Sequence, residues 1–271
     1  MFRTCTISNF DSQDLQPYRT MRRQMEHRRA GIFVAEGEKV VRRLLESHFE
    51  VISVLAPPNC VGELQGLLDG RKELIQVFVA EKKLLETLTG FSMYQGILAV
   101  GRVPPQRTLQ QIITQSTKPR LLVAVEGLTN AENMGAVVRN CSAFNAQAVV
   151  VGETCSSAFL RRAVRSSMGT VFGLPVVETV SLTETLARLK NQGIRCVAAH
   201  PHADGRTITR ADLTGDCCLI FGSEGYGLSP AVLELSDESA AIPMAPQVDS
   251  LNVANAAAVF LYEANRQRGR M

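Results

Sequence analysis

From Leu121 onward, apolar runs alternate regularly with amphipathic stretches. The runs are continuous rather than alternating with polar residues, which is typical of strands in a sheet covered by helices on both faces. Such strands joined by helices predict a parallel sheet in an α/β domain. The predicted strands are LLVAVEGL, QAVVVG, LPVVETV, IRCVAAH, CCLIFG and AIPMA, and the predicted helices begin near Glu132, Ala158, Leu182, Ser229 and Leu251.

The first hundred residues predict a smaller α/β unit. Its strands are GIFVAEG, FEVISVLA, LIQVFVA and QGILAVGRV, and its helices are EKVVRRLLESH and EKKLLETL. The first of these helices has a buried stripe of Val40, Val41, Leu44 and Leu45. Prolines and polar residues at 104–120 predict a linker with one helical turn in its middle. The expected organisation is therefore a domain at 1–103, a linker at 104–120 and a second domain at 121–271.

Bulk composition is that of an ordinary globular protein, with 45% hydrophobic and 20% charged residues. No apolar run approaches the roughly 18 residues of a membrane helix. The N-terminus MFRTCTISNFDSQD lacks the apolar core of a secretory signal, and its acidic residues argue against an organellar presequence. The seven cysteines show no paired spacing. We therefore expect a cytoplasmic protein with neither disulfides nor a zinc site.

The net charge of +3 matters less than where the positive charges lie. One cluster, RRAVR, spans residues 161–165. Clustered arginines suit a phosphate backbone. Taken alone, this cluster and the larger one near the N-terminus are each better explained as a solvated helix face. The larger cluster, within RTMRRQMEHRR, consists of Arg19, Arg22, Arg23, Arg28 and Arg29.

Arg139 stands apart on the predicted helix NMGAVVRNCSAF. The apolar stripe of this helix repeats at helical spacing through Met134, Val138 and Cys141. The opposite side carries small residues such as Gly135, with Arg139 as its single charge. An isolated helical arginine is usually solvated. A face trimmed to small side chains also leaves room for a ligand to approach the guanidinium.

Three predicted strand-to-helix turns carry glycine or polar residues: EGLTNAENMGAVVRN, CLIFGSEGYGLSP and IPMAPQVDSLNVANAAA. In a parallel sheet such turns lie at the carboxyl edge, where ligands bind against helix N-termini. The glycines at 222, 225 and 227 reverse the order of the dinucleotide-binding fingerprint. Glu224 would also repel a pyrophosphate. The pattern disfavours a nucleotide-dependent oxidoreductase and suits a ligand with a positive centre and an adenosine.

These three stretches resemble the motifs of the SpoU-type RNA methyltransferases of the SPOUT superfamily: N-x-G-x-x-x-R, G-x-E-G-x-G-[LIM]-S and I-P-M-x-x-x-x-x-S-L-N-V. The first domain, with FVAEGEKVVRRLLES, is similar to a ribosomal-protein-like substrate-binding domain found in several members. The resemblance implies a deep trefoil knot, bound S-adenosylmethionine and a homodimer. The alanine-rich face of ANAAAVFLYEAN suits a dimer contact or packing within the chain.

The resemblance also carries roles to individual positions. Arg139 is expected to grip a phosphate and orient a ribose 2′-hydroxyl, because a guanidinium stays protonated and makes a poor base. Helix capping would equally explain Ser250 and Asn133, and Asn252 could simply fill the first turns of the last helix. The expected catalytic residues are Asn133, Arg139, Glu224, Ser250 and Asn252. The expected cofactor-binding residues are Ala199, Gly222, Gly225, Ile242, Met244 and Leu251.

The sequence thus predicts an S-adenosylmethionine-dependent RNA 2′-O-methyltransferase. Its extra N-terminal domain favours ribosomal RNA over transfer RNA, with the larger arginine cluster as an RNA-binding surface. The alternatives are an inactive RNA-binding protein that keeps the fold and an enzyme that methylates a base nitrogen. A metal at His200, His202 and Asp204 is disfavoured, because methyl transfer from a sulfonium needs none. A nucleophilic thiol at Cys141 or Cys218 is disfavoured because a buried position explains Cys141 better.

Overall fold

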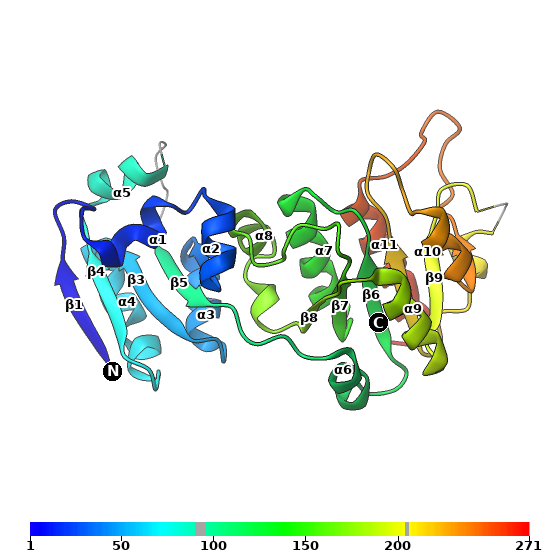
Figure 1. The fold of residues 1–271 in the computed structure, drawn as a ribbon, viewed down its shortest axis with the longest axis horizontal. Helices are drawn as coiled ribbons and strands as arrows, with labels where there is room; N and C mark the ends of the chain where they lie inside the picture. The colour runs from blue at the N-terminus through cyan, green and yellow to red at the C-terminus, as the bar shows by residue number, and fades with distance from the viewer. Residues whose placement is uncertain (90–95, 204–205, 271) are drawn as a thin grey trace. The chain divides into compact units, whose positions relative to one another are not determined.

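The computed structural model describes residues 1–89, 96–203 and 206–270. The chain forms two compact units (Figure 1). Unit 1 comprises Met1–Pro105 together with Phe159–Phe172. Unit 2 comprises Gln106–Ala158 and Gly173–Met271. The segment 159–172 thus packs with the N-terminal part of the chain, although it interrupts the sequence of the other unit.

Unit 1 contains a five-stranded sheet in the order β1-β4-β3-β5-β2. The pairs β1–β4 and β3–β4 are parallel, whereas β5 runs antiparallel to both β2 and β3. The predicted strands and helices of residues 32–103 are confirmed, and β1 and α4 are additional elements. The elements are β1 Phe2–Thr6, α1 Gln16–Arg19, α2 Gln24–Ala30, β2 Ile32–Glu36, α3 Glu38–Glu46, β3 Val51–Ala56, α4 Pro58–Asp69, β4 Ile75–Val79, α5 Lys82–Thr89 and β5 Leu98–Arg102.

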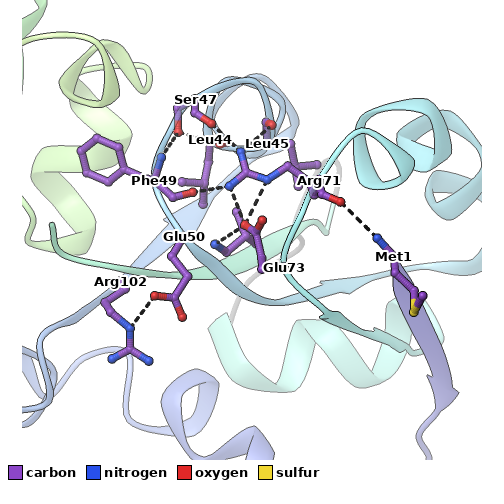
Figure 2. A network of polar contacts seen from close by, with 10 residues as sticks. Met1, Leu44, Leu45, Ser47, Phe49, Glu50, Arg71, Glu73 and Arg102 are labelled. Carbon is purple, nitrogen blue, oxygen red and sulfur yellow. Dashed lines mark hydrogen bonds and ion pairs between the residues drawn. The ribbon is translucent and has the colours of Figure 1, made fainter.

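The predicted stripe of α3 is buried as expected, with Val40, Val41, Leu44 and Leu45 each at most 3% exposed. After α3, Arg71 fixes the chain by donating hydrogen bonds to carbonyls that the helix end leaves unpaired (Figure 2). Burial alone would raise the pKa of Glu73, but hydrogen bonds from Arg71 and a backbone amide outweigh it and hold that pKa at about 2. The carbonyls that accept from Arg71 are those of Leu45, Ser47 and Phe49.

The segment 159–172 joins unit 1 through aromatic and ionic contacts. Phe172 stacks on Phe33 of β2 with 5.4 Å between ring centroids, and Phe159 lies 5.9 Å from the same ring. Helix α8, Arg161–Ser166, places Arg161 and Arg165 against the Glu36 carboxylate, which is only 5% exposed. Arg161 and Arg165 of RRAVR therefore share one buried carboxylate, whereas Arg162 is exposed.

Unit 2 contains a six-stranded sheet in the order β11-β9-β10-β6-β7-β8, and every pair of neighbours is parallel. The predicted parallel α/β fold is confirmed. The trefoil knot stays a prediction from the family resemblance. The elements are α6 Leu109–Gln115, β6 Leu121–Val125, α7 Ala131–Ala143, β7 Ala148–Val151, β8 Val176–Glu178, α9 Leu182–Asn191, β9 Arg195–Ala199, β10 Cys217–Phe221, α10 Pro230–Leu235, β11 Glu238–Ala240 and α11 Val253–Gln267.

Two local expectations for unit 2 need correction. The predicted strand AIPMA is not a strand, and β11 ends at Ala240. Its partner β9 ends at Ala199, and Ala241 beyond β11 forms only an isolated bridge with Thr207. In the predicted linker, α6 buries Ile112 and Ile113 in the main core of the unit. A capping box of Thr108 and Gln111 starts this helix, which is longer than the single turn expected.

Candidate active site

The first two motif turns meet because β6 and β10 are paired neighbours in the sheet, with Phe221 opposite Val125. Glu126 leaves the end of β6, and its carboxylate accepts a hydrogen bond from the Ser229 backbone amide at 2.8 Å. Ser229 also caps α10, with Pro230 at the first helical position, as the sequence predicts. The loop after β10 is therefore anchored at its far end by the loop after β6.

The loop after β10 is tightly closed upon itself. Ser223 and Gly227 exchange backbone hydrogen bonds of 3.1 and 3.0 Å. A Cβ added at Gly222 would lie 2.2 Å from the Gly227 carbonyl carbon, so only glycine fits there. Gly227 has a φ of +67°, which disfavours other residues. Gly222 thus permits the close approach of backbone to backbone, and Gly227 permits the turn.

A cavity of about 330 Å³ lies at the carboxyl ends of β9 and β10. Its walls come from the loop after β10, from the segment after β11 and from the start of α11. This volume is at the lower end of the range for small-molecule sites. All six residues predicted to bind the cofactor line this one cavity: Ala199, Gly222, Gly225, Ile242, Met244 and Leu251.

The charge of the cavity lining is acidic. Glu224 and Asp249 contribute carboxylates, and no lysine or arginine is present among the described residues that line it. Phe221, Phe260 and Leu228 supply apolar surface. A pyrophosphate would find no cationic partner on these walls, which weakens the oxidoreductase alternative further. A ligand with a positive centre and an apolar body matches the lining.

Asn252 joins the three motifs at the edge of the cavity. Its side-chain amide donates to Asn133 Oδ1 at 3.1 Å and also to Glu224 Oε1. Its own Oδ1 accepts from the Ala254 backbone amide at 2.9 Å, so Asn252 is the N-cap of α11. The interpretation of Ser250 as this cap is therefore wrong. Ser250 instead lies on the cavity wall.

Asn133 is likewise not a helix cap. The N-cap of α7 is Asn130, whose side chain accepts hydrogen bonds from the backbone amides of Glu132 and Asn133 at 2.8 and 3.3 Å. The Asn133 side chain is thereby available for Asn252. Of Asn133, Ser250 and Asn252, only Asn252 is a helix cap. Its side chain also connects Asn133 to Glu224.

Arg139 lies apart from this cluster within the single chain. Its side chain is exposed and, across the residues that the structure describes, makes no hydrogen bond or ion pair. It does not line the cavity. Six residues of helix separate it from Asn133, about 9 Å along the axis. The structure therefore brings together Asn133, Glu224 and Asn252, with Ser250 on the same cavity, and leaves Arg139 outside.

Sequence reasoning missed several lining residues. His200 and His202 follow β9, and the His202 backbone amide donates to His200 Nδ1 at 3.1 Å. Asp249 and Tyr226 line the cavity as well. Tyr226 stands inside the second motif, so its place in a glycine loop at a sheet edge could have singled it out. The histidines could have been found because they follow the strand that ends in Ala199.

The comparison with known families agrees with this geometry. Residues 120–262 match the model of the SpoU rRNA Methylase family. The chain belongs to this family. A Mycobacterium bovis protein named as an uncharacterized tRNA/rRNA methyltransferase is 33% identical over 238 residues, which cover 87% of this chain and 81% of the relative.

Solved structures of SpoU enzymes share the fold. The SpoU methyltransferase AviRb from Streptomyces viridochromogenes, in complex with AdoMet, gives a TM-score of 0.83 at 27% identity and covers 96% of this chain and 100% of that chain. An RNA 2′-O ribose methyltransferase gives 0.79 at 29% identity, with coverages of 98% and 99%. As a SpoU enzyme, the chain is an S-adenosylmethionine-dependent methyltransferase of tRNA or rRNA.

The two cysteines considered as nucleophiles are buried in this SpoU enzyme. Cys141 and Cys218 are both 0% exposed, and burial raises the pKa of each thiol, so neither side chain is placed to attack a base. Within 1–89, 96–203 and 206–270, no three histidine, cysteine or acidic side chains are grouped as metal ligands. Asp204 lies outside the described residues.

The five arginines predicted to bind RNA all lie on the surface of unit 1. Arg19 ends α1, whereas Arg28 and Arg29 occupy the last turn of α2. Arg23 precedes α2 and pairs with Glu26 at 3.0 Å. All five side chains are exposed, including Arg22.

Nowhere in the described part of the chain is a helix both long and apolar enough to cross a membrane.

Proposed function

We propose that this SpoU enzyme methylates a ribose 2′-hydroxyl in structured RNA, with ribosomal RNA as the first choice and transfer RNA as the second. The observation that carries the proposal is Asn252, which holds Asn133 and Glu224 together beside the acidic cavity. This arrangement sets polar groups where a hydroxyl would meet the methyl donor. The likeness to an RNA 2′-O ribose methyltransferase at 29% identity supports a ribose acceptor.

The cavity suits S-adenosylmethionine. Gly222, Gly225 and Gly227 carry no side chains on the wall formed by the loop after β10, so backbone groups at these positions can approach the cofactor closely. Apolar walls at Ile242, Met244 and Leu251 suit an adenine, and the carboxylates of Glu224 and Asp249 favour a positive charge. When bound, the cofactor supplies an electrophilic methyl group on a sulfonium. The remaining predicted contacts, Ala199 and Gly225, lie on the same lining.

The chain's own residues then orient the acceptor. The Glu224 carboxylate keeps one oxygen for Asn252, and its other oxygen can accept a hydrogen bond from the ribose hydroxyl. Ser250 and Asn133 complete the polar wall. Arg139 binds the neighbouring phosphate through its planar fork and remains protonated throughout. Holding the hydroxyl in line with the methyl group is the main contribution to rate.

A homodimer would bring Arg139 to the site. Because Arg139 is exposed and outside the cavity of its own chain, a second copy can deliver it to the cluster of the first. Within one chain, α11 already packs on α7, with Ala257 and Ala264 fully buried and Asn140 donating to the Ala254 carbonyl at 2.6 Å. The outer side of α11, where Val259 and Tyr262 are exposed, remains for a dimer contact.

The RNA itself would lie on unit 1 as well as on the catalytic cluster. The exposed arginines 19, 22, 23, 28 and 29 provide a positive surface for phosphates. The alternative of an inactive RNA-binding protein predicts the same surface. It also predicts no binding of S-adenosylmethionine, which makes cofactor affinity the decisive difference. A cytoplasmic location is part of this proposal.

The proposal is tested by incubating the protein with methyl-labelled S-adenosylmethionine and total RNA, followed by nucleoside mapping. We expect label in a 2′-O-methylated nucleoside, which protects its phosphodiester from alkaline hydrolysis, within a ribosomal RNA fraction. Label on a base would overturn the ribose assignment. No label together with no calorimetric binding of the cofactor would favour the inactive alternative.

A further inference from the structure

Tyr226 is an exposed aromatic residue at the mouth of the cavity. Its exposed fraction of 98% is the highest among the large apolar side chains in the described ranges. Burying an aromatic ring is strongly favourable, and Tyr226 obtains none of this within the chain. A ring in this position is therefore available to a ligand.

Hydrogen bonds hold the backbone of the loop at Tyr226 and on either side of it. The Tyr226 backbone amide donates to Ser223 Oγ at 3.1 Å, and the paired backbones of Ser223 and Gly227 close the loop. The two neighbours of Tyr226 are glycines, Gly225 and Gly227, so no adjacent side chain covers either face of the ring. The loop thus presents the aromatic ring from a fixed backbone, which lowers the entropy cost of binding to it.

The ring also lies beside the proposed acceptor site. Tyr226 follows Glu224 by two residues, and both line the cavity. Glu224 and Asp249 make this rim acidic, with no lysine or arginine among the described lining residues. An RNA phosphate is disfavoured at such a rim, whereas a nucleobase, which is flat and uncharged, is not. The part of the RNA that meets Tyr226 is therefore a base.

We propose that Tyr226 is a stacking platform for an unpaired nucleobase of the RNA substrate, next to the acceptor ribose. This inference rests on the proposed function for the position of that ribose. A base inside a duplex has both faces covered by its neighbours and cannot stack on a side chain. Stacking of this kind contributes enough affinity to be measured when the aromatic ring is removed. The substrate class is thus RNA whose target nucleotide lies in a loop, a bulge or a single strand.

The test compares Tyr226→Phe, which keeps the ring, with Tyr226→Ala, which removes it. The probes are a single-stranded oligoribonucleotide containing one 2-aminopurine and the same sequence paired in a duplex. Stacking quenches 2-aminopurine, so the readout reports the base rather than phosphates bound elsewhere. We expect wild type and Tyr226→Phe to quench the single strand alike, and Tyr226→Ala to lose the quenching and about 5- to 100-fold in affinity. The duplex should not distinguish the three proteins.

Val180→Ala is the matched control, because Val180 is 92% exposed and lies outside the cavity lining. Calorimetry with S-adenosylmethionine is run on every variant, and measurable binding by Tyr226→Ala shows that the cavity is intact. Equal quenching by Tyr226→Ala and Tyr226→Phe would overturn the inference. Wild-type ribose methylation of total RNA is measured in parallel, so that failure of the proposed function is recognised separately.

Discussion

Asn252 Nδ2 lies 3.1 Å from Asn133 Oδ1, although 119 positions separate the two residues in the sequence. The same amide donates to Glu224 and its oxygen caps α11. One side chain therefore ties the first and second motifs to the helix that begins in the third. The proposed catalytic cluster and the start of the last helix depend on the same residue.

Asn252→Asp separates these two roles. Aspartate is as good an N-cap as asparagine, so α11 should keep its stability within about 0.5 kcal/mol. It has no amide donor for Asn133 and sets a negative charge against Glu224. We expect methyl transfer to fall about 10- to 100-fold while the melting temperature hardly changes. Asn252→Ala, which also loses the cap, should cost about 1 kcal/mol of unfolding free energy in addition. Unchanged turnover in Asn252→Asp would contradict the bridging role.

The substitution Arg139→Lys tests whether the Arg139 guanidinium binds an RNA phosphate. Because Arg139 is exposed and has no partner in the described chain, the unfolding free energy should change by less than about 0.5 kcal/mol. A lysine is a point charge and cannot reproduce the planar fork, so methylation of RNA should fall at least about 100-fold. Calorimetry should show unchanged affinity for S-adenosylmethionine. A variant with near-normal turnover would remove Arg139 from the mechanism.

Gly222→Ala should disrupt the cavity wall. The added methyl group would lie 2.2 Å from the Gly227 carbonyl carbon, so the closed loop must shift. We expect a loss of about 1–3 kcal/mol in unfolding free energy and at least about tenfold in cofactor affinity. Gly215→Ala is the control, since an added Cβ there meets nothing within 4 Å. Full cofactor affinity in Gly222→Ala would show that the close approach is not needed.

The two arginines that meet Glu36 should differ in their contribution to stability. The Arg161 side chain is 15% exposed and that of Arg165 is 55% exposed, against a carboxylate that is 5% exposed. Arg161→Ala leaves a buried charge less compensated and should cost about 3–5 kcal/mol in urea unfolding. Arg165→Ala should cost less than about 1 kcal/mol. Equal losses would show that burial does not set the energies of this pair.

The surface arginines of unit 1 can be tested by salt. Each phosphate contact contributes about 0.7–0.9 to the slope of log affinity against log salt. Replacing Arg22 and Arg23 together by alanine should therefore lower that slope by about 1.5 for total RNA. Arg188→Ala, on the exposed side of α9 in unit 2, is the control and should leave it unchanged. Identical slopes for wild type and the double variant would exclude this surface.

Much of unit 2 could be predicted because most of its strands lie within continuous apolar runs. The run LLVAVEGL contains β6, and α7 buries Met134, Val137, Val138 and Cys141 as its periodicity predicts. The strand β11 was missed, because Glu238 and Ser239 interrupt the apolar pattern and the pairing depends on where β9 ends. The helix α6 was predicted as a single turn only, because Leu109, Ile112 and Ile113 are its sole apolar residues among glutamines and a threonine.

The site was predictable as a set of positions but not as an arrangement. The motifs named five of the residues that line the cavity, and the end of the strand IRCVAAH gave Ala199, because such loops follow strands at one sheet edge. The course of the backbone decides which asparagine caps a helix. Asn130 caps α7 and Asn252 caps α11. The separation of Arg139 from the cavity depends on helix orientation, which no local pattern reports.

The segment 159–172 passes into unit 1 and returns, so the backbone crosses between the units three times. A truncation near residue 105 would strip Phe159 and Phe172 of their aromatic neighbours and deprive Arg161 of its counter-ion. The part of the chain that follows residue 105 therefore depends on the N-terminal part for the packing of segment 159–172. An evolutionary gain or loss of the N-terminal part would have required a simultaneous change in the connection between β7 and β8.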